Sequence, residues 1–476
     1  MGLPIPDSPH ACLVSLPTWD AVIGYEEGHA DVVGKIRAGY PRFFVHPLTW
    51  KLFEELERRV AGEGERVVAY SSAAAAQRAG RFVERRTGSP VRCELVDGMP
   101  VLIVPRSSYQ AARDYWRHTG EIVSSRQAED ILAGTTRQRG EEVAQFRTGM
   151  AQTMKVERED CFVLESGMAA IFALYRVVTS RRPGKKTLQL CFPYVDALKV
   201  QEHFGSGVDF VRSTGGEQFR EALERIRGGE YAAVFCEAPS NPLLQTVDLH
   251  AVSAVCRESR TPLLVDDTIC SHANVEVLPW ADAVSTSLTK WVSGIGDVMA
   301  GAAKINRDSP LADEFRAALD AEIPEGSLLY GRDAEVLQAN ARGFEERVAA
   351  SNAGGEEVAE FLAGHSAIER VWYPKFVDRA NYDALRRPGC GYGGLLSFTL
   401  KIPARAPAVY EALRFSKGPS LGTEYSLICP YTLLAHYTEL KWAEECGVPR
   451  ELLRLSVGRE PVAELRARLE EALALG

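Results

Sequence analysis

The sequence predicts an α/β protein with a central, mostly parallel sheet and further structural units on both sides of it. The chain has 476 residues, which is more than one ordinary core holds, so two or three domains are expected. Hydrophobic residues make up 46% and charged residues 25%, as in a globular protein. In the middle of the chain, short apolar runs alternate with segments of helical spacing, and this alternation is typical of α/β folds.

The central sheet is predicted from strand-like apolar runs at 187–192, 208–211, 232–237, 262–267 and 283–287. Between them, "FREALERIRGG" and "LHAVSAVCRESR" have the apolar spacing of helices. Continuous apolar strands indicate a sheet that is covered on both faces. Because such sheets bind ligands at the carboxyl ends of their strands, we look for a site there.

The regions before and after the central unit have patterns of their own. Before it, "WKLFEELERRV" is helical, "RVVAY" is strand-like, and "CELV" and "PVLIV" flank the turn "DGM" as a hairpin would. After it, a helix-rich stretch leads to "GGLLSFTLKI", "ELLRLSVG" and the helical "PVAELRARLEEALAL", which suggests a smaller α+β domain. We divide the chain into an N-terminal arm (1–49), an inserted α/β segment (50–140), a large domain (141–325) and a small domain (326–476).

Composition argues against several classes of function. The formal net charge is −9, and no Lys/Arg cluster is long enough to bind nucleic acid. The sequence contains no apolar run of about 18 residues, so we predict no membrane span. The N-terminus lacks the pattern of a signal peptide. Ten cysteines occur without a CxxC pair, which argues against zinc and against a disulfide framework. We therefore expect no metal site and a reducing, cytoplasmic location.

Two motifs end predicted strands of the large domain. In "LESGMAAIFALYRVV", Ser166 and Gly167 open a helix whose free N–H groups can bind an anion, although alone this is more often an ordinary Ser-capped helix. In "LLVDDT", Asp266 places a carboxylate at a desolvated strand end, where a cation such as a protonated pyridine nitrogen would stabilise it. The alternative is a carboxylate that caps the next turn; it has comparable weight for Asp266 and more for Asp267.

A third motif, "SLTKWVSGIGDVMAG", sets Lys290 among hydroxyl and apolar side chains. The hydroxyls of Ser287 and Thr289 can bind a phosphate, and burial favours the neutral lysine amine that imine formation requires. The glycines at 294, 296 and 301 do not have the spacing of a dinucleotide-binding loop. A fourth motif, "CEAPSNP", holds Asn241 in a turn just past a strand, where a plain turn-forming Asn is the alternative.

Taken in order, these motifs resemble the pyridoxal 5′-phosphate (PLP) enzymes of cysteine and methionine metabolism, the cystathionine γ-synthase and γ-lyase family. "SGMAAI", "APSNP", "LVDDT", "SLTKWVSGIGDVMAG" and "LLRLSVG" carry the resemblance, which covers roughly residues 153–476. It implies a fold-type I, aminotransferase-like domain with a mostly parallel seven-stranded sheet between helices, and PLP as the cofactor.

The resemblance implies a role for each matching residue at the cofactor. Lys290 would be its covalent anchor and would then carry protons, and Asp266 would keep the pyridine nitrogen protonated. Tyr194 in "CFPYVDA" would stack on the ring and act in proton transfer, and Asn241 would lie beside the ring oxygen. The phosphate would be bound by the amides of Gly167 and Met168 and by the hydroxyls of Ser287 and Thr289.

On the substrate side, the resemblance implies that Arg454 in "LLRLSVG" binds the α-carboxylate, a bidentate task that suits a guanidinium. Ser426 in "EYSL" would assist it. Tyr425 stands where the family has an acidic residue, although Glu424 is adjacent, and Ile295-Gly296 replaces a polar pair after the lysine. These departures would make the substrate pocket more apolar.

The N-terminal "GYPRFFVHP" resembles the family's Tyr-x-Arg segment, with Tyr40 and Arg42 at the matching positions. This implies an arm that reaches the neighbouring subunit's phosphate, with a homodimer as the catalytic unit and a homotetramer as the usual assembly. Tyr40 could also be a plain core aromatic. The inserted segment, together with "LPTWDAVIGYEEG", "GYPRFFVHP" and "CPYTLLAHYTEL", resembles the fungal-type cystathionine γ-synthase branch. A lid, an oligomer contact and a structural role remain open for the inserted segment.

The implied activity is PLP-dependent γ-replacement on a small γ-substituted L-amino acid, such as an activated homoserine that reacts with a thiol. The alternative is a γ-lyase of specialised metabolism that needs no thiol and, with a vinylic halide as leaving group, releases an alkyne or another unsaturated amino acid. A catalytically silent cofactor-binding protein is a third possibility. The residues leave the leaving group, the nucleophile and the pathway open.

Overall fold

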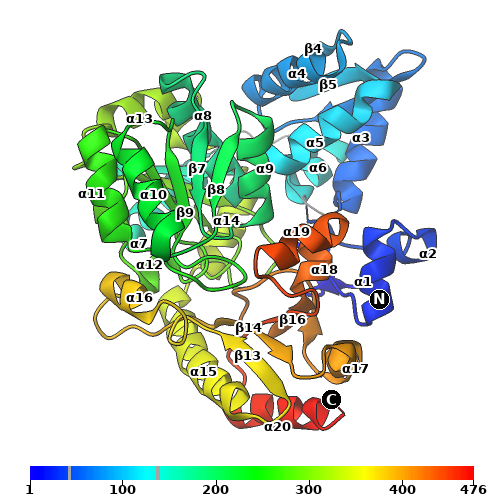
Figure 1. Cartoon of the computed structure of the whole chain (residues 1–476). Coiled ribbons are helices and arrows are strands. Elements are labelled where there is room, and N and C mark those ends of the chain that lie inside the picture. Colours follow the sequence, from blue (N-terminus) through cyan, green and yellow to red (C-terminus); the bar gives the residue numbers. More distant parts are fainter. Residues whose placement is uncertain (41–43, 136–139, 476) are drawn as a thin grey trace.

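The computed structural model of the chain describes residues 1–40, 44–135 and 140–475. Figure 1 shows a large unit around a sheet (green), the inserted segment beside it (blue to cyan), and a smaller unit below both (yellow to red). The domain boundaries that we chose from the sequence stay predictions. Each of the two hydrophobic clusters contains residues from more than one unit, so the clusters do not mark where one unit ends.

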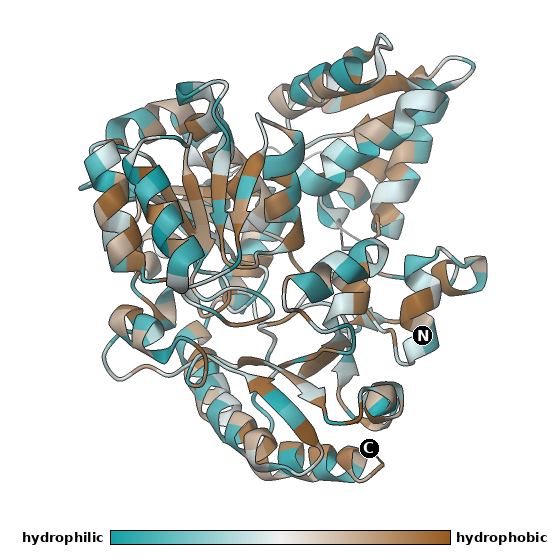
Figure 2. Cartoon of the chain, in the orientation of Figure 1, coloured by the Kyte–Doolittle hydropathy of each residue, from teal (hydrophilic) through white to brown (hydrophobic). Residues whose placement is uncertain are grey.

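The large unit contains the expected mostly parallel sheet of seven strands, in the order β6-β12-β11-β10-β9-β7-β8. Strand β12 runs antiparallel to both of its neighbours, and the remaining pairs are parallel. In Figure 2 the strands of this sheet are largely hydrophobic, as strands covered on both faces must be. The strands are β6 (Cys161–Leu164), β7 (Thr187–Leu190), β8 (Val208–Val211), β9 (Val234–Glu237), β10 (Leu263–Asp266), β11 (Ala283–Ser287) and β12 (Gly301–Ile305).

Helix α8 (Gly167–Arg181) leaves the end of β6 and is buried along most of its length. Ser166 caps it, because its Oγ accepts a hydrogen bond from the N–H of Ala169 at 3.0 Å. The helix packs on β11 and β12 on one side and on the inserted segment on the other. The other helices of this unit are α7 (Glu141–Met154), α9 (Val195–His203), α10 (Gly216–Arg227), α11 (Leu249–Ser259), α12 (Ser271–Asn274) and α13 (Ala312–Asp320).

The inserted segment is an antiparallel sheet of order β3-β5-β4 with helices packed on it. Its hairpin turns at Asp97 and Gly98, both with positive φ, which confirms the predicted "DGM" turn. Rings of the segment and of the large unit pack together where Tyr115 meets Phe172 and Phe204. Its elements are α3 (Pro47–Val60), β3 (Glu65–Ala69), α4 (Ala73–Thr87), β4 (Arg92–Val96), β5 (Met99–Pro105), α5 (Tyr109–Thr119) and α6 (Ser125–Leu132).

The small unit is a sheet of order β13-β14-β17-β16-β15, antiparallel except for the last pair. Its strands are β13 (Ile368–Trp372), β14 (Leu395–Leu400), β15 (Ser416–Lys417), β16 (Leu427–Pro430) and β17 (Leu453–Ser456). Its helices are α14 (Gly331–Asn340), α15 (Phe344–Gly364), α16 (Arg379–Leu385), α17 (Ala406–Ala412), α18 (Tyr431–His436), α19 (Leu440–Glu445) and α20 (Val462–Leu473). Strands β16 and β17 carry Cys429 and Arg454, which line a cavity together with residues of the large unit.

The N-terminal arm packs on its own chain. It contains β1 (Pro4–Ile5), β2 (Leu13–Val14), α1 (Trp19–Glu26) and α2 (Ala30–Val33). The N–H of Cys12 donates to Gly296 O at 2.7 Å, and Tyr410 Oη donates to Leu16 O at 2.6 Å. The arm is thereby joined to the loop after Lys290 and to the small unit. Over the described ranges, no helix combines the length and the apolar character that crossing a membrane requires.

Candidate active site

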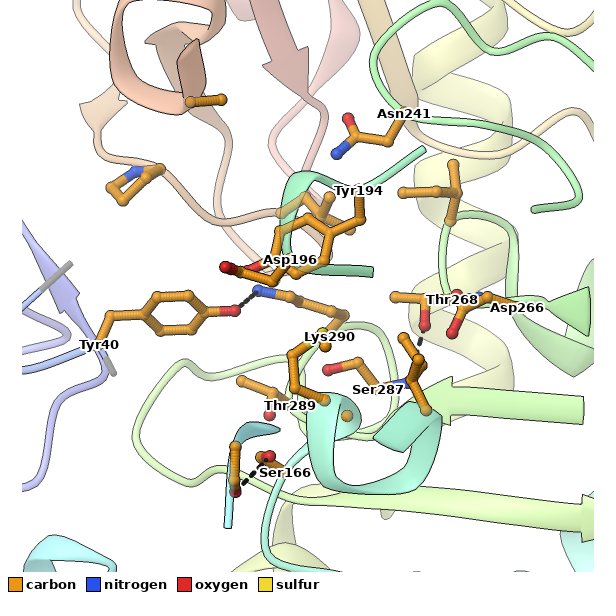
Figure 3. Close-up of a pocket in the computed structure, with 18 of the residues that line it drawn as sticks. Tyr40, Ser166, Tyr194, Asp196, Asn241, Asp266, Thr268, Ser287, Thr289 and Lys290 are labelled. Atoms are coloured by element: carbon orange, nitrogen blue, oxygen red, sulfur yellow. Dashed lines mark hydrogen bonds between the residues drawn. The ribbon is translucent and has the colours of Figure 1, made fainter. Parts of the chain in front are cut away.

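A cavity opens at the carboxyl ends of the central strands and takes lining residues from the arm, the inserted segment, the large unit and the small unit. Figure 3 shows Lys290 in it. The Nζ of Lys290 donates to Ser420 Oγ at 2.8 Å and to Tyr40 Oη at 3.1 Å, and the residue is 8% exposed. A buried amine held by hydroxyls is available for chemistry at the cavity.

Asp266 lies at the end of β10 with its carboxylate at the cavity. Its Oδ1 accepts from the N–H of Thr268 at 2.9 Å, and its Oδ2 accepts from Ser285 Oγ at 2.6 Å. Desolvation raises the pKa of this carboxyl to about 6. Its neighbour Asp267 differs, because it points the other way and forms a buried ion pair with Lys304. Asp266 is therefore the carboxylate that a cationic ligand would stabilise.

The start of α8 and the end of β11 approach closely enough to form a cradle. A Cβ on Gly167 would lie 2.7 Å from Ser287 Cβ, so only glycine fits there. Met168, Ser287 and Thr289 also line the cavity. Thr289 Oγ1 accepts from the N–H of Ala300 at 3.1 Å, which fixes the loop between Lys290 and β12. Free helix N–H groups and nearby hydroxyls suit a phosphate.

Arg454 of β17 is 4% exposed and faces the same cavity. Its Nη1 donates to Asn241 Oδ1 at 3.0 Å, and its Nη2 donates to the carbonyl oxygens of Pro419 and Ser420, each at 3.0 Å. The guanidinium lies 4.9 Å from the ring centre of Tyr431. It is thus held in place at the site expected for a substrate carboxylate.

Ser426 and Tyr425 do not line the cavity, in contrast to the sequence-based expectation. Ser426 Oγ donates to Glu460 at 2.9 Å, and Tyr425 Oη donates to Ile295 O at 2.9 Å. The reason is strand register: in the β16–β17 ladder Cys429 lies opposite Arg454, so Ser426 lies beyond the cavity, near the end of β17. Ser420, six positions earlier in the same loop, takes the place next to the lysine.

The sequence reasoning missed several lining residues, of which Glu237 had a usable signal, because it ends a predicted strand as Asp266 does. Its carboxylate accepts the N–H groups of Tyr194 at 2.5 Å and Asn241 at 3.1 Å. Burial raises the pKa of Glu237 well above its usual range. The missed lining residues include Arg117, Asp196, Glu237, Ser420 and Tyr431.

Tyr194 and Tyr40 both project into the cavity, and Figure 3 shows them with Lys290. Tyr40 belongs to the arm, and its Oη accepts from Lys290 Nζ of the same chain. The arm also lies against the small unit of the same chain. That the arm reaches a neighbouring subunit stays a prediction. The other arm residue of that expectation, Arg42, falls outside the residues that the structure describes.

These residues fit PLP: a buried lysine amine, a desolvated carboxylate for the ring nitrogen and a cradle that only glycine permits. In the ranges that the structure covers, no group of three or more His, Cys, Asp or Glu residues is placed to hold a metal ion. The fold and the site together define a fold-type I PLP-dependent enzyme.

The chain belongs to the family described as Cys/Met metabolism PLP-dependent enzymes, which matches residues 135–474. The domain described as the N-terminal domain of fungal trans-sulfuration enzymes matches residues 49–124. Most of the inserted segment therefore matches a domain that is described for fungal trans-sulfuration enzymes.

Curated relatives match along nearly the whole chain. A cystathionine gamma-synthase of Neurospora crassa is 30% identical and covers 98% of this chain and 96% of its own length. The L-2-amino-4-chloropent-4-enoate dechlorinase/desaturase of Streptantibioticus cattleyicolor is 33% identical and covers 96% of this chain and 95% of its own length. A crystal structure of cystathionine gamma synthase from Xanthomonas oryzae pv. oryzae shares the fold with a TM-score of 0.61 at 24% identity, over 72% of this chain and 89% of that one.

Proposed function

We propose that the chain catalyses a PLP-dependent reaction at the γ carbon of an L-α-amino acid, with γ-replacement of an activated homoserine by a thiol as the first candidate. The observation that carries the proposal is the double role of Ser420. Its hydroxyl accepts from Lys290 at 2.8 Å, and its carbonyl accepts from Arg454 at 3.0 Å. A substrate whose carboxylate binds Arg454 therefore presents its α carbon to the lysine amine.

The residues divide the work as follows. PLP supplies the electron sink when it is bound. Asp266 keeps the ring nitrogen protonated, because its desolvated carboxylate gains from a cation. Lys290 takes the proton from Cα and delivers protons nearby, since its side chain lines the cavity and its Nζ is held there by the hydroxyls of Tyr40 and Ser420. Arg454 and Asn241 would orient the substrate, and Tyr194, which lines the cavity, would stack on the cofactor ring and take part in proton transfer.

The apolar part of the cavity lining favours a second candidate, γ-elimination without a thiol acceptor. Leu421, Leu434 and Ala435 of the small unit line the cavity, as does Met299. An apolar lining stabilises an uncharged γ-substituent better than the ammonium and carboxylate of an incoming cysteine. The similarity to the Streptantibioticus dechlorinase/desaturase supports this candidate, and the similarity to the Neurospora synthase supports the first.

One substrate panel tests both candidates. The enzyme is given O-acyl homoserines with and without cysteine, and an L-amino acid with a vinylic chloride at Cγ, and products are read by mass spectrometry. Cystathionine formed only with cysteine supports replacement. Chloride release with an alkyne product supports elimination. Turnover no faster than with free PLP on every substrate would contradict the proposal.

The assembly and the location are also proposals. A homodimer, paired into a homotetramer, is supported by the family resemblance; Tyr40 gives it no further support, because it lies in the site of its own chain. Light scattering of the purified protein measures the assembly directly. A cytoplasmic location is supported by ten free cysteines, most of them buried.

A further inference from the structure

The inserted segment touches the cofactor end of the cavity at one place, the end of helix α5. Gly120 follows the helix with φ +69°, and its carbonyl accepts from Ser166 Oγ at 2.8 Å. A Cβ on Gly120 would collide with Ser166 and Met168. Because these are the residues that open α8, the last turn of α5 lies directly against the phosphate cradle.

Arg117 lies in that last turn and lines the cavity. The other cationic lining residues among the described ones are Lys290, the cofactor anchor, and Arg454, whose guanidinium is held at the substrate end. A phosphate carries close to two negative charges, and helix N–H groups alone leave most of that charge unpaired. The family resemblance assigns part of that charge to Arg42, which falls outside the described residues; among the described residues at this end of the cavity, Arg117 is placed to supply a cation.

The side chain of Arg117 is only partly used by the protein. Its Nε is buried and has no hydrogen-bond partner within the described part of the chain. Its contact with Asp114 is long, 3.7 Å from Nη2 to Oδ1, and the side chain is 42% exposed. A guanidinium with spare donors at the edge of an anion cradle can bind a phosphate directly.

His118 and Asp196 hold the side chain of Arg117 in position. Arg117 Nη2 lies 3.3 Å from His118 Nε2, and His118 Nδ1 lies 2.8 Å from Asp196 Oδ1. Because a guanidinium can only donate, His118 Nε2 accepts from Arg117, and the protonated Nδ1 of His118 donates a hydrogen bond to the Asp196 carboxylate. Because Asp196 belongs to α9 of the large unit, this chain of contacts ties the insert to the wall of the cavity.

We propose that Arg117 of the inserted segment binds the PLP phosphate and that His118, held by Asp196, positions it. The segment is then part of the cofactor site, not merely a lid or an oligomer contact. This inference rests on the family's cofactor and is independent of the γ-carbon chemistry proposed above, so a negative substrate panel leaves it standing.

The test compares PLP with pyridoxal, which lacks the phosphate. Cofactor-free enzyme is titrated with each compound, and binding is measured by equilibrium dialysis. Arg117→Ala is expected to weaken PLP binding about 10- to 100-fold, the effect of a lost charge-assisted hydrogen bond, with pyridoxal binding unchanged. Arg117→Lys should recover part of the loss, and His118→Leu should show a smaller, equally phosphate-dependent loss.

Arg85→Ala is the matched control, because Arg85 is an exposed arginine of the same segment. Thermal unfolding of each cofactor-free variant verifies that it is folded. Unchanged PLP affinity in Arg117→Ala would overturn the proposal. An equal loss for PLP and pyridoxal would also overturn it, because it would mean that Arg117 shapes the cavity without touching the phosphate.

Discussion

The two ends of the cavity are built in different ways. At the cofactor end, Asp266 closes β10, Ser287 closes β11 and Gly167 opens α8, so a single sheet fixes their positions. At the substrate end, Arg454 of the small unit is held by Asn241 of the large unit, 213 positions earlier in the chain. One end depends on strand geometry and the other on how two units pack together.

This difference separates two kinds of property. Groups held by the sheet are rigid and serve the chemistry that all substrates share. Groups held between units can be changed by small movements or by loop substitutions, and they select the substrate. Changes at the cofactor end should therefore lower kcat for every substrate, whereas changes at the substrate end should alter KM and the choice of substrate.

The largest effect is expected for Lys290→Ala, since this lysine serves both ends. Loss of the anchor and of the proton carrier should lower kcat by about 10³-fold or more on every substrate tested. The measurement is single-turnover product formation. A small primary amine added to the assay should restore part of the rate, and activity close to that of the wild type without it would remove Lys290 from the mechanism.

The next effect is expected for Asp266→Asn, which should lower kcat about 100-fold, because the ring nitrogen loses its anionic partner. The stability of the cofactor-free protein, in contrast, should increase. The folded pKa, about 6, is raised above the ordinary 3.8, so the stability that this carboxyl contributes is present at low pH and is lost as pH rises through about 6.

Cofactor-free Asp266→Asn should therefore be about 1–3 kcal/mol more stable than the wild type near pH 8, and the gain should shrink near pH 5. Urea unfolding of both proteins at the two pH values measures this. The conservative control is Asp266→Glu, which keeps the charge. A variant equally destabilised at both pH values would indicate that the carboxyl is simply structural.

The same comparison explains what the sequence could predict. Asp266 ends a strand, Gly167 begins a helix and Lys290 lies three residues past the end of β11, and apolar periodicity locates those places without further information. Five strands of the central sheet, β7 to β11, and the hairpin at Asp97 follow from equally local patterns, whereas the total of seven strands was implied by the family resemblance. Glu237 had the same strand-end signal, so it too could have been found.

The substrate end was less predictable because its signals are not local. Ser420 and Ser426 lie in one loop, "SLGTEYS", and only the register of β16 against β17 decides which hydroxyl reaches the cavity. Arg117 comes from a segment whose packing against α8 no local pattern encodes. The path of the arm, and with it Tyr40, depends in the same way on tertiary contacts.

At the substrate end, Arg454→Lys should raise KM for the amino acid and lower kcat/KM about 10- to 100-fold, with a smaller change in kcat. A lysine keeps the charge but cannot donate to Asn241, Pro419 and Ser420 while also binding a carboxylate in bidentate fashion. Steady-state kinetics with the best substrate of the panel measures the split. If kcat fell and KM stayed constant, Arg454 would belong functionally to the cofactor end.

The smallest and sharpest test compares Ser420→Ala with Ser426→Ala. Ser420 contacts the lysine amine, so its loss should lower kcat/KM roughly tenfold, the effect of one hydrogen bond to a charged group. Ser426 bonds to Glu460 and to the N–H of Gly458, so its loss should cost about 1 kcal/mol of stability and leave kcat/KM within about twofold. The same alanine change in one loop thus separates catalysis from folding. The opposite result, a loss of kcat/KM in Ser426→Ala and a loss of stability alone in Ser420→Ala, would contradict this register of β16. It would mean that Ser426, and not Ser420, reaches the cavity.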